Sequence, residues 1–79
     1  MSIESRVKEI IIDQLGCQPS EVVPEADITN DLQADSLDRY ELIMGFEDHF
    51  DLKIDDDEAS KLTTVGKIID YLRSLNIED

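Results

Sequence analysis

The 79-residue sequence contains few of the residues that build turns, strands and disulfide bonds. It has three Gly, two Pro, no Trp and only four Tyr and Phe, which disfavours a hairpin-rich β fold because strands and tight turns favour those residues. Its single cysteine, Cys17, excludes an internal disulfide bond and a multi-cysteine metal site. A chain of this size has one hydrophobic core, so we expect a single domain over residues 1–79 and no metal centre.

Basic residues are also scarce. Seven Lys and Arg face twenty Asp and Glu, which gives a formal net charge of −13. This charge disfavours nucleic acid and anionic membranes as ligands, because both need clustered cations, and it favours basic protein partners. The longest aliphatic run is residues 10–12, too short for a signal peptide or a membrane span. We therefore expect a cytoplasmic protein, or a matrix or plastid protein if a transit peptide has been removed. We also expect a monomer.

Aliphatic residues are abundant. The hydrophobic share is 41%, with ten Ile and eight Leu, which disfavours intrinsic disorder. Apolar residues recur at helical spacing over residues 3–15 and 65–75, so each segment predicts an amphipathic helix. The residues expected to cap these two helices are Ser2, Gly16, Thr64 and Asn76.

The middle of the chain has a different pattern. Residues 17–35 lack periodicity and contain both prolines, but scattered apolar residues predict a long loop packed onto the core. A second helix is expected from about Ser36 to Phe50, and residues 56–62 leave room for one short helical piece. The sequence therefore predicts an all-α fold, a small bundle of three longer helices plus one short helix, with a long first loop.

The predicted helix over residues 36–50 is apolar on two adjoining sides. One side is an ordinary core stripe formed by Leu42, Ile43, Phe46 and Phe50. The other side lies beside Glu41 and Asp48 and consists of Leu37, Tyr40 and Met44. It is either part of a wide buried face or an exposed strip. Between residues 9 and 52 there are twelve acids and one base, Arg39, and this imbalance favours an exposed docking surface for a basic protein.

The run Asp-Leu-Gln-Ala-Asp-Ser-Leu-Asp at residues 31–38, followed by Glu-Leu-Ile-Met at 41–44, resembles the signature of the acyl carrier protein family. The similarity continues through Thr-Thr-Val at 63–65 and Ile-Asp-Tyr-Leu at 69–72. The resemblance implies a carrier protein and not an enzyme, with a 4′-phosphopantetheine arm on Ser36. That arm would hold acyl groups as thioesters for enzymes of fatty-acid or specialised, polyketide-type biosynthesis.

The resemblance also implies roles for the residues around Ser36. Asp35 would contact the phosphopantetheinyl transferase or its metal. Acyl-processing enzymes with basic patches would dock on Leu37, Asp38, Tyr40, Glu41, Met44, Glu47 and Asp48. The acyl chain would enter the bundle beside this helix, at a pocket that we expect to be formed by Arg39, Ile43, Phe46, Phe50 and Ile54. A hydroxyl at a helix N-terminus suits an attached anion, and a simple N-cap role for Ser36 is the alternative.

Other functions fit the sequence less well. A hydrolase pair of Ser36 and His49 is excluded because thirteen helical residues separate them by roughly 20 Å. A calcium loop starting at Asp51 would have Asp56 where Gly is required and Leu62 where a bidentate Glu is required, so only diffuse divalent-ion binding is plausible. An acidic interaction module would not explain a serine delivered by a long loop.

Four positions depart from the family pattern. Gln33 stands where Gly is common, Arg39 where a small hydroxyl residue is common, Tyr40 where Val is common and Asp55 where Pro is common. These departures favour a specialised role over housekeeping fatty-acid synthesis. A peptidyl or aminoacyl carrier is the alternative within the family, but the Gln-Ala-Asp run before Ser36 is more typical of the acyl type.

Arg39 falls inside the core stripe of its helix, where a buried guanidinium without a partner would be costly. We expect its aliphatic stem to lie over the end of the bundle and its charge to reach solvent or a loop acid such as Asp27 or Asp31. Together with Phe46 it would narrow the entrance for the acyl chain. Long saturated chains would then be sheltered poorly, and short, polar or carboxylated groups favoured. An outward-facing surface cation is the alternative for Arg39.

Overall fold

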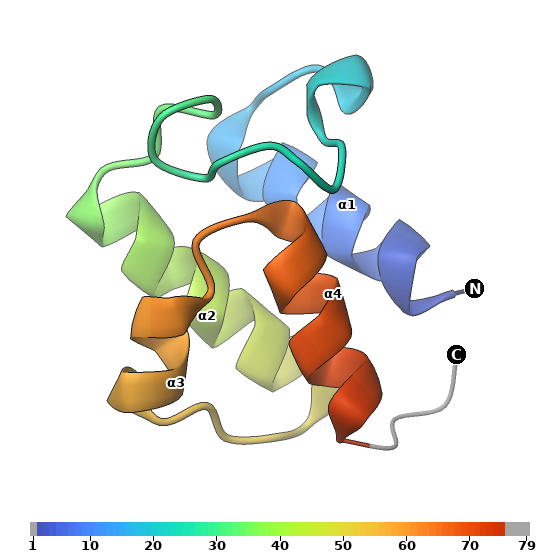
Figure 1. Ribbon diagram of the computed structural model, residues 1–79, viewed down its shortest axis with the longest axis vertical. Coiled ribbons are helices and arrows are strands. Elements are labelled where there is room, and N and C mark those ends of the chain that lie inside the picture. Colours follow the sequence, from blue (N-terminus) through green and yellow to red (C-terminus); the bar gives the residue numbers. More distant parts are fainter. Residues whose placement is uncertain (1, 76–79) are drawn as a thin grey trace.

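The computed structural model describes residues 2–75, which form four α-helices and one short 3₁₀ helix (Figure 1). The elements in chain order are α1 (Ile3–Leu15), η1 (Pro19–Glu21), α2 (Ser36–Phe50), α3 (Asp56–Lys61) and α4 (Val65–Ser74). The described residues contain no strand, only an isolated bridge between Asp27 and Thr64. The predicted bundle of three longer helices and one short helix is confirmed.

The ends of α1 and α4 follow the sequence pattern. The side-chain oxygens of Ser2 and Thr64 accept hydrogen bonds from the backbone N–H groups three residues further on, at 3.1 and 3.2 Å. Gly16 ends α1 with φ of +67°, a left-handed conformation that glycine adopts without steric cost. The predicted cap at Asn76 lies outside the described residues.

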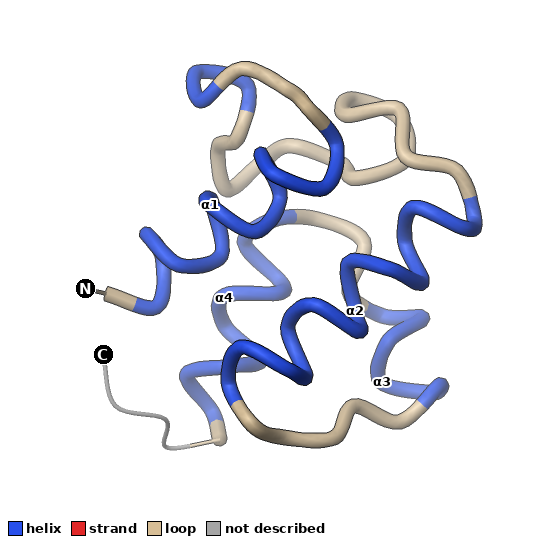
Figure 2. Tube along the Cα trace, turned by 180° about the vertical axis from the view of Figure 1, so that it is seen from behind, coloured by secondary structure: helices blue, strands red, loops and turns tan. Residues whose placement is uncertain are grey.

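Helix α1 packs against both α2 and α4 (Figures 1 and 2). The buried side chains of these three helices are Ile3, Val7, Ile11, Leu42, Phe46, Val65, Ile68, Ile69 and Leu72. Each contributes about 1.5–3 kcal/mol through removal of apolar surface from water. Helix α3 has no buried residue, so it borders the core without filling it.

The long first loop, residues 16–35, is held against the start of α4. Its buried side chains are Val22, Ala26, Ile28, Leu32 and Ala34. Three backbone hydrogen bonds of 2.9–3.1 Å join the loop to the α3–α4 junction; they link Ile28 to Thr63, Val65 to Ala26, and Gly66 to Pro24. A Cβ atom on Gly66 would lie 3.0 Å from the Pro24 carbonyl oxygen, which explains a glycine there. The loop therefore delivers the start of α2 from a fixed position.

Candidate functional site at the start of α2

Helix α2 begins with a reciprocal capping arrangement. An Asp35 carboxylate oxygen accepts a hydrogen bond from the Asp38 N–H at 2.8 Å, and an Asp38 carboxylate oxygen accepts one from the Asp35 N–H at 3.3 Å. Asp35 has extended backbone angles, as an N-cap requires, and Ser36 is already the first helical residue. The alternative of Ser36 as the N-cap is therefore wrong, and Asp35 holds that position.

The Ser36 side chain is exposed, and among residues 2–75 its hydroxyl has no hydrogen-bond partner. The backbone N–H groups of Ser36 and Leu37 also have no acceptor within the described chain, as is usual for the first turn of a helix. Free N–H groups and the positive end of the helix dipole attract anions. The site therefore combines an available hydroxyl with a surface suited to a negatively charged substituent.

Gln33 makes the turn that leads into this site. Its φ of +60° lies in the left-handed region, where a non-glycine residue costs on the order of 1 kcal/mol. The neighbouring Leu32 and Ala34 are both buried, and the Ala34 N–H donates to the Ile28 carbonyl at 3.0 Å. Packing on both sides of Gln33 therefore imposes the conformation. A glycine at this position would adopt the left-handed conformation without steric cost, whereas Gln33 is held in it by its buried neighbours.

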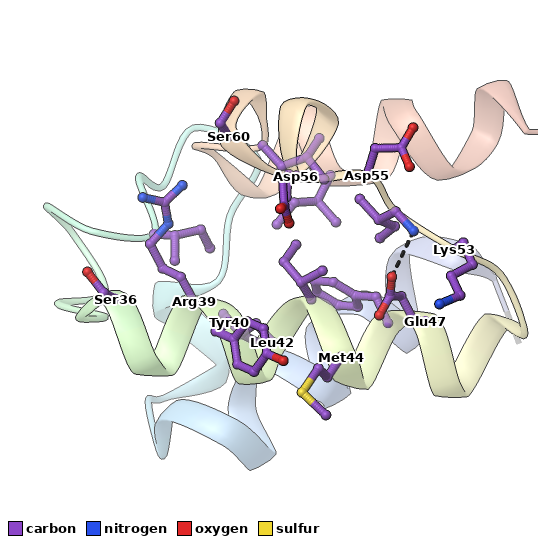
Figure 3. A pocket seen from close by; sticks show the side chains of 17 residues that line it. Ser36, Arg39, Tyr40, Leu42, Met44, Glu47, Lys53, Asp55, Asp56 and Ser60 are labelled. Atoms are coloured by element: carbon purple, nitrogen blue, oxygen red, sulfur yellow. Dashed lines mark hydrogen bonds between the residues drawn. The ribbon is translucent and has the colours of Figure 1, made fainter.

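A pocket of about 570 Å³ lies between α2 and α3, and Ser36 is part of its wall (Figure 3). Its inner wall is apolar and includes Ile28, Leu42, Phe46, Ile54 and Ile68. Polar side chains surround the opening, with Ser36 and Arg39 at one end, Glu47 and Lys53 at the other, and Asp55, Asp56 and Ser60 across from α2. The pocket is therefore an apolar space with a polar rim, adjacent to the Ser36 hydroxyl.

Four of the five residues predicted for an acyl pocket line this space, namely Arg39, Ile43, Phe46 and Ile54. Phe50 does not, and its place in the predicted pocket is corrected. Phe50 is half-buried beneath Arg6 of α1, whose guanidinium carbon lies 5.5 Å from the ring centroid. It lies one helical turn beyond Phe46, where α1 rather than α3 covers α2.

Arg39 is half-buried at the Ser36 end of the pocket. It forms no ion pair with any described residue, so of the two alternatives expected for its charge, solvent or a loop acid such as Asp27 or Asp31, the loop acid is not the one observed. The Asp27 carboxylate instead accepts hydrogen bonds from the N–H groups of residues 29 and 30, at 2.9 and 2.8 Å. The Asp31 carboxylate accepts one from the Asp27 N–H at 2.8 Å. Both acids are engaged in holding the loop.

The predicted apolar strip is exposed. The exposed fractions of its side chains are 63% for Leu37, 63% for Tyr40 and 45% for Met44. Glu41 and Asp48 are exposed as well, which supports a surface strip over a wide buried face. We call these five residues the α2 strip.

Two other carboxylates predicted to dock partners have structural contacts. Glu47 is half-buried and accepts a hydrogen bond from the Ile54 N–H at 2.8 Å, which holds the α2–α3 connection (dashed line in Figure 3). Asp38 is half-buried in the capping arrangement of α2. Sequence spacing gave no signal for the Glu47 contact, because it depends on where the backbone turns after α2, whereas Asp35 and Asp38 have the i, i+3 spacing of a capping box.

A family model described as the phosphopantetheine attachment site matches residues 5–72. The chain belongs to the acyl carrier protein family. One similar solved structure is that of a Mycobacterium tuberculosis protein assigned as an acyl carrier protein, with 26% identity, a TM-score of 0.87 and coverage of 94% of this chain and 99% of that chain. Another is the acyl carrier protein of Enterococcus faecalis, with 32% identity, a TM-score of 0.78 and coverage of 94% and 98%.

As an acyl carrier protein family member, this chain is a carrier and not an enzyme, and 4′-phosphopantetheine is its cofactor. It is a substrate for a phosphopantetheinyl transferase and a partner for acyl-processing enzymes. The start of α2 fits the cofactor, because a partner-free hydroxyl, two free N–H groups and the positive end of a helix dipole lie together there. The arm supplies a thiol on which acyl groups are carried.

The other reactive groups within residues 2–75 do not indicate a second site. Burial raises the pKa of the Cys17 thiol above its ordinary value, which keeps it protonated and a poor nucleophile at neutral pH. No group of three or more His, Cys, Asp or Glu within residues 2–75 is arranged to hold a metal ion. None of the helices in that part of the chain is long and apolar enough to cross a lipid bilayer.

Proposed function

We propose that Ser36 carries the 4′-phosphopantetheine arm and that this protein, as a cytoplasmic monomer, presents acyl thioesters to enzymes of fatty-acid or specialised acyl biosynthesis. The observation that supports this assignment is the exposed, partner-free Ser36 hydroxyl at the start of α2. The adjoining pocket has an apolar inner wall on which part of an attached group can rest.

Incubation with coenzyme A, magnesium and a phosphopantetheinyl transferase tests the attachment. The intact mass should increase by one phosphopantetheine group, and fragmentation should locate it on Ser36. Ser60 provides an internal comparison, because it lines the same pocket but its hydroxyl donates to the Asp57 carbonyl at 2.7 Å. Modification of Ser60, or no gain in mass, would refute the assignment.

We propose the α2 strip as the docking surface for the transferase and for acyl-processing enzymes. It joins exposed apolar side chains to exposed carboxylates on a chain with a net charge of −13. Basic patches would be drawn to it by long-range attraction, and apolar contacts would then hold the complex.

The two kinds of contact should separate in transferase kinetics. Glu41→Lys should slow modification by roughly threefold to tenfold at low salt, because charge acts mainly on the association rate, and the difference should shrink at high salt. Met44→Ala should weaken binding at every salt concentration. Asp70→Lys, the same charge change on an exposed residue of α4, is the matched control. Wild-type kinetics in both strip variants would rule out this surface.

We propose short, polar or carboxylated acyl groups as the preferred cargo, or chains that stay outside the bundle. The polar rim supports this preference, and Arg39 at the mouth adds bulk and charge beside Ser36. A long saturated chain would have to pass the guanidinium to reach the apolar inner wall, which requires that cation to move or lose water.

Melting temperatures of acylated proteins test this cargo preference. A long saturated acyl chain on the arm should stabilise the wild type little and Arg39→Thr clearly more, because the smaller side chain opens the mouth. A short acyl chain on both proteins is the control for the arm itself. Equal, large stabilisation of the wild type and Arg39→Thr by the long chain would contradict the preference.

A further inference from the structure

Arg39 is an unpaired cation in a chain that has twenty acids. Its guanidinium makes no ion pair or hydrogen bond with any described residue, and the one ion pair in residues 2–75 joins Lys61 to Glu58 at 3.7 Å. The side chain is half-buried in the pocket wall, so it is less free to remain fully hydrated than a surface arginine. Five N–H donors in a planar fork are therefore available at one place on the molecule.

The position of this cation relative to Ser36 is fixed by α2. Arg39 follows Ser36 by three residues, and side chains at that spacing emerge from neighbouring points on a helix, about 5–6 Å apart at Cβ. Both line the same end of the pocket (Figure 3). An anion attached to the Ser36 oxygen would thus lie within the reach of the arginine side chain and beside the free N–H groups of Ser36 and Leu37.

We propose that Arg39 and the first turn of α2 form a binding site for the phosphodiester of the arm. This inference depends on the proposed attachment at Ser36. A phosphodiester carries one negative charge and two free oxygens, which match the fork of a guanidinium. The pair would hold the base of the arm at the pocket mouth and turn it toward α3. Arg39 is a positioning residue in this arrangement.

Lys53 is a suitable reference cation. It lines the same pocket, has no ion-pair partner within the described residues, and lies at the end opposite Ser36 (Figure 3). Removing its charge changes the net charge of the protein as much as removing that of Arg39. It leaves the neighbourhood of the attachment site intact, so general electrostatics and local binding can be told apart.

The experiment compares the unmodified and phosphopantetheinylated forms of the wild type, Arg39→Gln and Lys53→Gln in dilute buffer, with free thiols and no cargo. In the wild type and Lys53→Gln, modification should raise the melting temperature by about 4 °C, the shift expected for one favourable charged contact in a domain of this size. In Arg39→Gln, modification should not raise the melting temperature, because the phosphodiester adds one more negative charge to a strongly negative chain. The phosphorus NMR resonance of the modified Arg39→Gln protein should differ from that of the modified wild type, whereas the resonance of modified Lys53→Gln should match the wild type.

Equal changes in melting temperature and identical phosphorus resonances in all three proteins would overturn the site.

Butyryl and succinyl thioesters distinguish the two anions that Arg39 could bind, the phosphodiester of the arm and a carboxylate of the cargo. They have equal chain length and differ in a terminal carboxylate. The proposal expects succinyl to stabilise the protein no more than butyryl does. Stabilisation by succinyl alone, lost in Arg39→Gln, would assign the guanidinium to the cargo and refute phosphodiester binding. Failure of Ser36 to accept the arm would show in the intact mass and would refute the proposed function, and this inference with it.

Discussion

The Ser36→Ala variant should accept no phosphopantetheine and should melt at nearly the wild-type temperature. The Ser36 hydroxyl has no partner in the described chain, and the N-cap of α2 is Asp35, so alanine at position 36 removes no stabilising contact. Sequence spacing alone, with Ser36 as a cap, predicts a loss of about 1 kcal/mol instead. Intact mass after transferase treatment and a thermal melt by circular dichroism measure the two outcomes on one sample.

Variants of Asp35 provide the comparison. Asp35→Ala should lose about 1 kcal/mol because it removes the cap, whereas Asp35→Asn retains a good capping side chain and loses only the charge. Slow modification of Asp35→Asn at normal stability would indicate that the carboxylate serves the transferase. A modified Ser36→Ala protein, or one that melts as low as Asp35→Ala, would contradict the roles given to these two residues.

The Phe46→Ala variant should lose about 3–5 kcal/mol of unfolding free energy, because it leaves a large cavity in the core. The Phe46 side chain is fully buried, with an exposed fraction of 0%, and it also forms part of the inner wall of the pocket. Domains of this size have a total stability of only about 5–10 kcal/mol, so much of the margin would be lost. Urea unfolding of the unmodified protein gives the value directly.

Phe50→Ala is the matched control, since it deletes the same side chain one helical turn away. Phe50 is half-buried, and its described ring contacts are with Arg6 and His49. Its loss should be about 1–2 kcal/mol, as expected for partial burial and a cation–π contact. Similar losses for the two variants would contradict the assignment of Phe46 alone to the pocket and the inner core.

The helices could be predicted from the sequence because their signals are local. Apolar residues at helical spacing, together with Ser2, Gly16 and Thr64 at the ends, define α1 and the start of α4 within a short stretch of chain. For Tyr40 the sequence left a wide buried face and an exposed strip as alternatives, and the acids on the same helix favoured the exposed strip that the structure has. These features need no knowledge of what the rest of the chain covers.

The details that could not be predicted depend on tertiary contacts or on nearly equal local preferences. Asp35 and Ser36 are adjacent and are equally good caps, so propensity could not choose between them. Phe46 and Phe50 share one stripe, and only the positions of α1 and α3 separate their environments. The sequence left open whether the Arg39 charge reaches solvent or a loop acid, and the acid is not its partner because the Asp27 carboxylate accepts hydrogen bonds from backbone N–H groups of its own loop.

Helix α3 has six residues and no buried side chain, so little free energy opposes its local unfolding. Helix α1 lies against both α2 and α4, and its buried side chains Ile3, Val7 and Ile11 oppose its local unfolding. We therefore expect the α3 wall of the pocket to give way more easily than the opposite wall on α2, which is anchored by the buried Leu42 and Phe46. We expect the space available to cargo behind Arg39 to depend on the stability of this six-residue helix as well, so substitutions in α3 should change the cargo range without touching the attachment site.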